Sequence, residues 1–320
     1  MSELYHVSSS PHVRAKDTTS KIMLWVIIAM LPMVAFGTYN FGPRALLLIG
    51  ITVLSCVASE YVFNLITRRK QTIGDLSAVV TGMILALNMP VNLPIWEAIL
   101  GAVFAIIIVK MMFGGLGQNF MNPALGARCF LLIAFAADMT NYNCDNYTGA
   151  TPLLQIRQNG GEIPDGLNVM DMLTGHIAGT IGETSVIAIL IGAIILILAG
   201  VINLRIPASY IITFAILMFV FGPSQYDSTY VVAQLCGGGL MFGAFFMATD
   251  YVTSPITPMG QVLFGICCGV FTAIFRLIGA NAEGVSFAII LSNLLVPLIE
   301  KITIPRAFGV VKVKAKKEEK

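Results

Sequence analysis

IMLWVIIAMLPMVAFGT, residues 22–38, contains no charged side chain and almost no polar one. A bilayer core about 30 Å thick is crossed by roughly 20 predominantly apolar helical residues. Similar stretches recur along the whole chain of 320 residues, which is 57% hydrophobic and 11% charged, with a mean hydropathy of +0.84. Soluble domains carry about 25% charged residues. The composition therefore excludes a soluble domain and predicts a polytopic membrane protein.

Ten apolar stretches predict ten membrane-spanning helices. The first twenty residues are polar, so no cleavable signal is expected before the first span. The third and fifth spans are short, which predicts tilted or interrupted helices there. The predicted spans are 22–38, 45–66, 76–89, 95–113, 123–138, 184–202, 206–222, 230–248, 259–276 and 285–303.

The basic residues orient these spans. Of the 19 Lys and Arg residues, only Arg44, Arg157 and Arg276 fall on one side of the ten-span arrangement; the other 16 (19 − 3), Lys110 and Arg128 among them, fall on the other. Short cytoplasmic segments carry an excess of basic residues. Both termini are therefore predicted to be cytoplasmic, and the loop 139–183, about 45 residues long, to lie outside. Loops of that length are usually functional or disordered.

The two groups of five spans are weakly similar. Because each group has an odd number of spans, the two would have opposite topology, an inverted-repeat plan that recurs in transporters. Chance similarity between Gly-rich membrane segments is the alternative. The matching residues, separated by 29 and then 31 positions from the first, are Asn88, Gly117 and Asn119 in one group and Asp250, Gly279 and Asn281 in the other.

The predicted organisation has five parts. These are a cytoplasmic tail (1–21), a first membrane repeat of five helices (22–138), an extracytoplasmic loop (139–183), a second membrane repeat of five helices (184–303) and a cytoplasmic tail (304–320). The six cysteines form no C-x-x-C pair and the three histidines have no ligand spacing, so no metal site is indicated.

A glycine-rich turn, GGLGQNFMNPA at Gly114–Ala124, precedes the predicted fifth span. Asn122 is a favourable N-cap and Pro123 a favourable first helical residue. The side-chain amides of Asn119 and Asn122 can bind the polar edge of a flavin or a headgroup. The alternative is a re-entrant turn whose asparagines satisfy freed backbone groups at membrane depth.

A second polar string, TDYVTSPITP at Thr249–Pro258, follows the predicted eighth span. Asp250, Thr253 and Ser254 offer a carboxylate and hydroxyls, which can coordinate a hard cation or hold a ligand ring. A capped, rigid turn between helices fits the same string.

The loop 139–183 contains the string DNYTGAT at Asp145–Thr151. The small residues Thr148, Gly149 and Ala150 leave the backbone accessible. The hydroxyl of Thr151 is therefore predicted to be within reach of an enzyme or a ligand.

Together these three strings resemble the RnfD/NqrB family of respiratory, ion-pumping redox complexes. The resemblance rests on Asp-x-x-Thr-Gly-Ala-Thr, Gly-x-Asn-x-x-Asn-Pro-Ala and Thr-Asp-x-Val-Thr-Ser-Pro, and Thr148 stands where Ser is common. It covers nearly the whole chain, whose length and Lys-rich C-terminus are closer to the RnfD members than to the longer NqrB members. The expected fold is an all-α polytopic membrane protein: ten transmembrane helices in two inverted five-helix repeats, similar to urea transporters.

The resemblance implies a covalent flavin in the loop. Thr151 would carry FMN through a phosphoester bond, attached outside the cytoplasm by a separate flavin transferase. Asp145, Thr148, Gly149 and Ala150 would be the residues that the transferase recognises.

A second, noncovalent flavin is implied near the cytoplasmic face. Asn119 and Asn122 match the family's asparagine pair and would bind riboflavin there. Asp250, Thr253 and Ser254 are further candidates for cofactor binding. Flavins held near both faces would suit an electron path across the membrane.

The implied role is electron relay in a translocase of the prokaryotic inner membrane that oxidises ferredoxin, reduces NAD⁺ and exports Na⁺ or H⁺. The chain would not be catalytic alone. Implied partners are the lipid bilayer, the flavin-bearing protein RnfG and the iron–sulfur proteins RnfA, RnfB, RnfC and RnfE; no nucleic-acid partner is indicated.

Three alternatives remain open. A small-solute channel or permease of the same inverted-repeat type, resembling urea transporters, would bind no chromophore. A scaffold subunit would leave Thr151 unmodified. An NqrB-type subunit would serve a complex with a quinone as electron acceptor.

Overall fold

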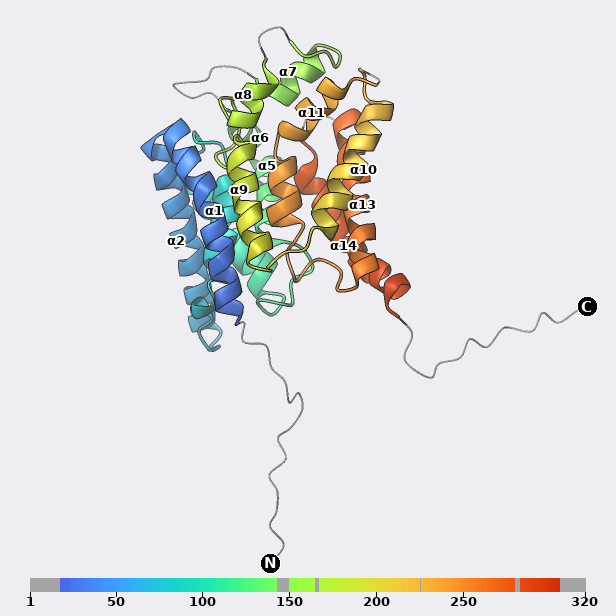
Figure 1. The fold of residues 1–320 in the computed structure, drawn as a ribbon. Helices are drawn as coiled ribbons and strands as arrows, with labels where there is room; N and C mark the ends of the chain where they lie inside the picture. The colour runs from blue at the N-terminus through green and yellow to red at the C-terminus, as the bar shows by residue number, and fades with distance from the viewer. Residues whose placement is uncertain (1–17, 143–149, 165–166, 225, 280–282, 306–320) are drawn as a thin grey trace, which may run out of the picture.

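The computed structural model describes residues 18–142, 150–164, 167–224, 226–279 and 283–305, and within these ranges it contains helices and no strand. The all-α prediction is confirmed. The long helices run side by side, and α7 and α8 lie across one end of the bundle (Figure 1). The described chain begins and ends at the opposite end. We call the end with α7 and α8 the loop-side end, and the end where the described chain begins and ends the tail-side end.

The helices of the first half coincide with the first five predicted spans. The fourth and fifth spans each consist of two successive helical segments. The elements are α1 (Thr19–Phe41), α2 (Pro43–Ile66), the 3₁₀ turn η1 (Ile73–Asp75), α3 (Ser77–Leu87), α4 (Ile95–Val103), the π-helix η2 (Phe104–Met111), α5 (Pro123–Ala134) and α6 (Ala136–Met139).

Two short helices belong to the predicted loop, α7 (Pro152–Gln158) and α8 (Val169–Thr174). The second half then coincides with the last five predicted spans. Its elements are α9 (Val186–Leu198), α10 (Arg205–Phe221), α11 (Ser228–Cys236), α12 (Leu240–Phe242), the π-helix η3 (Gly243–Met247), α13 (Pro258–Leu277) and α14 (Val285–Thr303).

Among the described residues, fewer than ten helices are long enough to cross a bilayer on their own. Four described helices, α1, α2, α13 and α14, are long and apolar enough to cross a bilayer. The bent run of α11, α12 and η3 adds a fifth if it is counted as one span, and α3, α5, α9 and α10 are shorter apolar helices. The chain is thus a multi-pass membrane protein. The brevity expected of the third and fifth spans is confirmed by α3 and α5, of 11 and 12 residues.

Local chemistry explains where key helices begin. Asn122 adopts an extended conformation, and its Oδ1 accepts the backbone N–H of Ala124 at 3.0 Å. Pro123, which lacks an N–H to satisfy, is the first residue of α5. The predicted cap is therefore confirmed. The corner between α1 and α2 is made by Gly42, at φ 77°, followed by Pro43.

The run of α11, α12 and η3 is broken in the middle of the protein. Its two parts are bent by 66°. The break falls at the three glycines 237–239, and Gly238 has a φ of +66°, which residues other than glycine rarely adopt. Broken helices in membrane proteins expose backbone groups that must be satisfied inside the protein.

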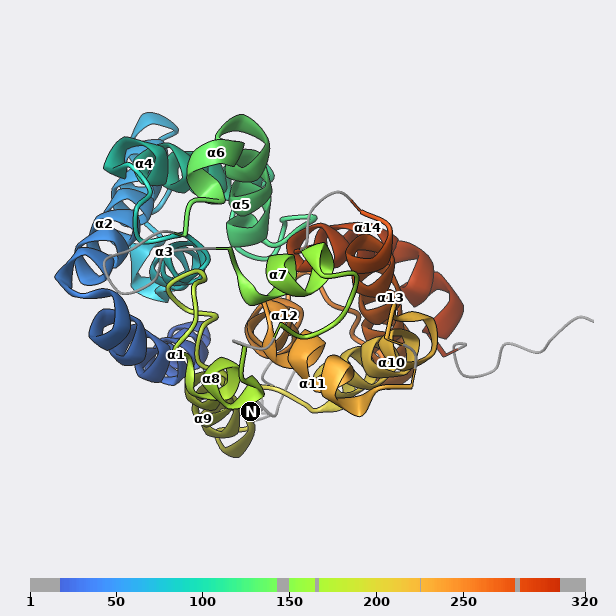
Figure 2. The same ribbon diagram turned by 90° about the horizontal axis from the view of Figure 1, so that it is seen from above.

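Helix α3 lies among the helices of the first half, and every one of its residues but Val79 is buried. Seen from above, α1 to α6 lie on one side and α10 to α14 on the other, with α7 across the middle (Figure 2). Helix α9 packs against α1. That approach is close because Gly192 of α9 lies against the backbone oxygen of Ala29 and the ring of Phe246.

Replacing Gly192 with alanine should destabilise the fold. A Cβ there would clash with the Ala29 oxygen and lie 2.8 Å from Cζ of Phe246. Overpacking of this kind costs about 1–3 kcal/mol, against about 1 kcal/mol gained from helix propensity. Gly50→Ala, in α2 with open space around its Cβ position, is the matched control. Thermal unfolding in detergent should show a lower midpoint for Gly192→Ala and no decrease for Gly50→Ala; equal midpoints would contradict the packing.

Candidate functional site

A cavity opens at the tail-side end of the bundle, between the start of α1, α3, α5, the end of α9 and the segment after η3. It encloses about 780 Å³, the open solvent at its mouth included. Most of its wall is apolar. The polar side chains in the wall are Ser77, Thr81, Lys110, Asn119, Asn122, Thr249, Asp250 and Tyr251.

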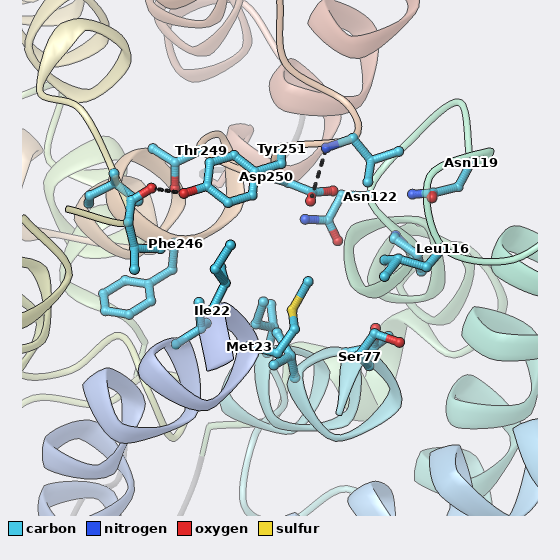
Figure 3. Close-up of a pocket in the computed structure, with 18 of the residues that line it drawn as sticks. Ile22, Met23, Ser77, Leu116, Asn119, Asn122, Phe246, Thr249, Asp250 and Tyr251 are labelled. Atoms are coloured by element: carbon cyan, nitrogen blue, oxygen red, sulfur yellow. Dashed lines mark hydrogen bonds between the residues drawn. The ribbon is translucent and has the colours of Figure 1, made fainter. Parts of the chain in front are cut away.

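This cavity brings together two strings that are far apart in the sequence. Asn119, Asn122 and Asp250 all line it. Figure 3 shows the side chains of Asn122 and Asp250 next to each other, with Asn119 on the same side and Met23 of α1 across from them. The glycine-rich turn and the TDYVTSP string thus form one wall.

The two asparagines differ in what remains available on their side chains. Both polar atoms of the Asn122 side chain make hydrogen bonds within the protein. Oδ1 caps α5, and Nδ2 donates to the carbonyl of Met247 at 3.3 Å. Asn119 donates Nδ2 to the carbonyl of Met121 at 3.0 Å, while its buried Oδ1 has no hydrogen-bond partner. A buried acceptor without a partner is costly. Asn119 is therefore the asparagine with an atom to offer a ligand.

Asp250 is held in place by its own turn. Its carboxylate accepts the Thr253 hydroxyl at 3.2 Å and the Val252 N–H at 3.5 Å. Burial raises the pKa of this carboxyl, and the two hydrogen bonds oppose that rise. Thr253 supports Asp250 and is not itself among the residues of the cavity wall, and Ser254 donates its backbone N–H to the Asp250 carbonyl at 3.1 Å.

A buried lysine adds a charge that the sequence analysis placed on the cytoplasmic side. Lys110, in the π-helix η2, is 2% exposed. Its Nζ lies 2.7 Å from a carboxylate oxygen of Glu60 and 2.6 Å from Oγ of Ser77. One sequence feature could have indicated this buried pair. A lysine lies within the apolar run of the fourth predicted span, and ionisable residues in such runs usually have a partner.

At the loop-side end, Thr151 is the N-cap of α7 and is 7% exposed. Threonine at this position usually accepts a backbone N–H of the first turn, but its side chain makes no such bond. The carbonyl of Ala150 accepts Nε2 of Gln155 at 2.6 Å. Asp145, Thr148 and Gly149 lie outside the described residues.

Helix α7 rests on the break in the α11–α12 run. A Cβ on Gly237 or Gly238 would lie 2.9 Å or 2.6 Å from a methyl carbon of Leu153, two residues after Thr151. The glycines therefore allow α7 to approach the bundle closely.

Between the two ends lies a buried charge cluster that sequence reasoning missed. Arg128 of α5 is 3% exposed. Its Nη1 donates to Oδ1 of Asn88 at 2.7 Å, and its Nη2 lies 2.8 Å from Glu283 and 3.8 Å from Glu183. Asn88 follows α3, whereas the two glutamates precede α14 and α9. One guanidinium thus joins elements from both halves of the chain.

Glu183 is incompletely satisfied in this cluster. One carboxylate oxygen accepts the Thr180 N–H at 3.2 Å, and the other has no hydrogen-bond partner. Glu183 ends a predicted loop and Arg128 was counted with the cytoplasmic residues, so neither was expected inside the protein. The signal for Arg128 was a charged residue five positions into an apolar helix.

The helical fold describes a multi-pass membrane protein with a mostly apolar cavity at its tail-side end. Residues 6–309 match the NQR2, RnfD, RnfE family, and the chain belongs to this family.

Three relatives match over nearly their full length. The D subunit of the Na⁺-translocating ferredoxin:NAD⁺ oxidoreductase complex of Acetobacterium woodii is 47% identical, over 96% of each chain. The D subunit of the proton-translocating ferredoxin:NAD⁺ oxidoreductase complex of Clostridium ljungdahlii is 39% identical, over 96% of each. The D subunit of an ion-translocating oxidoreductase complex of Actinobacillus succinogenes is 34% identical, over 96% of this chain and 98% of the relative. The family assigned from the three strings is confirmed.

Removing the Arg128 guanidinium should destabilise the protein strongly. In Arg128→Met the carboxylate of Glu283 loses its partner at 2.8 Å, and breaking a buried ion pair costs about 3–5 kcal/mol. Arg205→Met, at an exposed arginine 3.5 Å from Gln261, is the matched control. Thermal unfolding in detergent should separate the two variants. Arg128→Met/Glu283→Gln should recover part of the loss, and no recovery would mean that the unpaired carboxylate is not the cause.

Proposed function

We propose that the chain is the D-type membrane subunit of an ion-translocating ferredoxin:NAD⁺ oxidoreductase complex, in which it relays electrons across the membrane. The observation that carries this proposal is the 47% identity to the Acetobacterium woodii protein over 96% of both chains. Relatives are named for Na⁺ and for protons, so the coupling ion is one of these two. The complex as a whole would be the enzyme.

The proposed topology is ten crossings in two inverted five-helix repeats, with both termini in the cytoplasm and the loop 139–183 outside. Support comes from the match between each predicted span and a helix or run of helices. Further support comes from the position of α7 and α8 at the end of the bundle opposite to both described chain ends (Figure 1). The excess of basic residues then assigns the tail-side end to the cytoplasm.

Thr151 is proposed as the attachment point of FMN through a phosphoester to its hydroxyl. The residue fits this role because its side chain makes no cap hydrogen bond, so the ester would displace none. FMN when bound supplies one- and two-electron redox chemistry. Because Thr151 is only 7% exposed, we expect the flavin transferase to act before α7 packs onto the bundle.

The tail-side cavity is proposed as the site of noncovalent riboflavin. Its apolar wall suits an aromatic ring system, and the free Oδ1 of Asn119 can accept an N–H from the ligand's polar edge. Asp250 lies in the same wall, and Lys110, whose Nζ is bound to Ser77, also lines the cavity. Asn122 orients the start of α5 and so positions the wall.

The proposed partners are the other proteins of such a complex, the flavin-bearing RnfG and the iron–sulfur proteins RnfA, RnfB, RnfC and RnfE. A flavin at each end of the bundle would receive electrons on one face and pass them on at the other. The names of the relatives, which denote one subunit of a larger complex, support an assembly of this kind.

Covalent attachment is tested by in-gel flavin fluorescence of the chain expressed together with a flavin transferase. The wild-type band should fluoresce after denaturation and washing, and Thr151→Ala should be dark because it lacks the hydroxyl that forms the ester. Thr174→Ala, at another loop threonine, should fluoresce like the wild type. A dark wild-type band, or a fluorescent Thr151→Ala band, would refute attachment at Thr151.

The riboflavin site is tested by extracting and quantifying noncovalent flavin. Asn119→Ala should lower the riboflavin content at least several-fold, since a hydrogen bond between neutral groups, of about 1 kcal/mol, is lost together with wall surface. The covalent flavin should not change. Asn203→Ala, at an exposed asparagine of the same end, should bind like the wild type. Unchanged riboflavin in Asn119→Ala would rule out this cavity wall as the binding site.

A further inference from the structure

A second cavity lies at the loop-side end, between α7, α11 and α13. It encloses about 540 Å³, its open mouth included. Its polar side chains are Arg157, Tyr230, Gln234 and Arg276, and none of the described residues that line it is acidic. The described lining of this cavity therefore carries two arginines and no acidic residue, whereas Asp250 lines the tail-side cavity.

Arg276 is the buried cation of this cavity, at 7% exposure. All of its hydrogen bonds go to neutral oxygens: Nη1 donates to the carbonyl and to the side-chain oxygen of Gln234, the latter at 3.2 Å, and Nη2 donates to the carbonyl of Gly237 at 3.1 Å. Its Nε has no hydrogen-bond partner. The guanidinium also lies 5.0 Å from the ring centre of Phe214.

No carboxylate of the described chain forms an ion pair with Arg276. Nη2 of Arg276 and Cγ of Glu283 both lie near Gly238, at 3.3 Å and 3.6 Å from the position that a Cβ would take there. The carboxylate of Glu283 is already paired with Arg128 at 2.8 Å. The other two buried cations, Lys110 and Arg128, each have a carboxylate within 4 Å. A buried cation without a paired anion is costly, so an anion is expected at Arg276.

Arg157 brings a second guanidinium to the cavity. It lies in the last turn of α7, and its Nη2 donates to the carbonyl of Gly279 at 2.6 Å. Guanidinium groups bind phosphate and carboxylate groups through paired N–H donors. Two of them around one cavity suit a phosphate group.

The surroundings indicate where that phosphate comes from. The cavity is bordered by Pro223, just after α10, and by Leu277, at the end of the membrane-spanning helix α13. Next to these, Phe221, Ile274 and Ile278 are exposed, Ile278 to 81%. The apolar ends of α10 and α13 thus offer a surface for acyl chains beside a cationic cavity.

We propose that the loop-side cavity binds the phosphate of an anionic phospholipid headgroup, with Arg276 and Arg157 as its cationic donors. The acyl chains lie along the exposed ends of α10 and α13. Because α7 supplies Arg157 and α13 supplies Arg276, the bound headgroup joins the loop segment to the membrane bundle. Neither Thr151 nor any residue that lines the tail-side cavity lines this site.

The test is lipid retention by the purified full chain, measured by native mass spectrometry after exchange into mixed micelles of phosphatidylglycerol and phosphatidylcholine. The wild type should retain phosphatidylglycerol in preference to phosphatidylcholine. Arg157→Gln and Arg276→Gln should each weaken retention at least tenfold. Arg44→Gln, at an exposed loop-side arginine that donates to Asn92, should behave like the wild type. If Arg276→Gln fails to fold, Arg157→Gln, at an exposed position, still decides the question.

Two further arms separate the sources of the phosphate. Inorganic phosphate against chloride, at equal ionic strength, should raise the unfolding temperature less than phosphatidylglycerol does. Stabilisation by inorganic phosphate without lipid retention would overturn the proposal, as would equal retention by the wild type and both arginine variants. Thr151→Ala should retain the lipid fully. Loss of lipid in that variant would assign the cavity to the loop flavin and overturn the lipid proposal, whereas a dark gel band alone would leave it standing.

Discussion

Arg128 is the constraint around which the rest of the bundle is arranged. A guanidinium is always charged, and at 3% exposure it needs anions and acceptors supplied by the protein. Asn88 at the end of α3, Glu183 before α9 and Glu283 before α14 supply them. These three residues come from segments that are distant in the sequence, so satisfying one charge fixes the positions of three chain segments and joins the two halves.

The same need for internal partners explains the irregular backbone nearby. Helix α3 stops at Leu87 and leaves its last carbonyls to neighbouring segments, and the N–H groups of Ile181 and Gly182 bind the carbonyls of Met89 and Leu87. The glycines 237–239 interrupt the facing run and bring backbone close to Glu183 and Arg128. Shortened helices at the centre of a membrane protein are sustained only where other protein groups replace the missing hydrogen bonds. Here the replacements come from the end of the loop 139–183.

Much of the fold was readable from the sequence because apolar length and helix caps are local properties. The ten apolar stretches each matched a helix or run of helices, and the cap at Asn122 and Pro123 was predicted correctly. The meeting of Asn119 and Asp250 in one cavity wall was not predictable from spacing, because it depends on how the two halves pack. The burial of Arg128 and Lys110 was not predicted for a related reason. A charge count treats every basic residue as solvated, and it cannot see a carboxylate that tertiary packing brings within 4 Å.

Three glycines in a row leave no side chain between Leu153 of the loop helix and the charges below it. A Cβ on Gly237 would meet Leu153, one on Gly239 would meet Glu183 or Arg128, and one on Gly238 would lie near both Leu153 and Arg276. The wall between the loop segment and the interior is therefore a single thickness of backbone. A larger residue in place of one of these glycines would displace the side chains packed against it. Substitutions in the loop helix and among the buried charges are therefore expected to occur together. A loop exchanged between relatives would have to bring its matching glycines and glutamates with it.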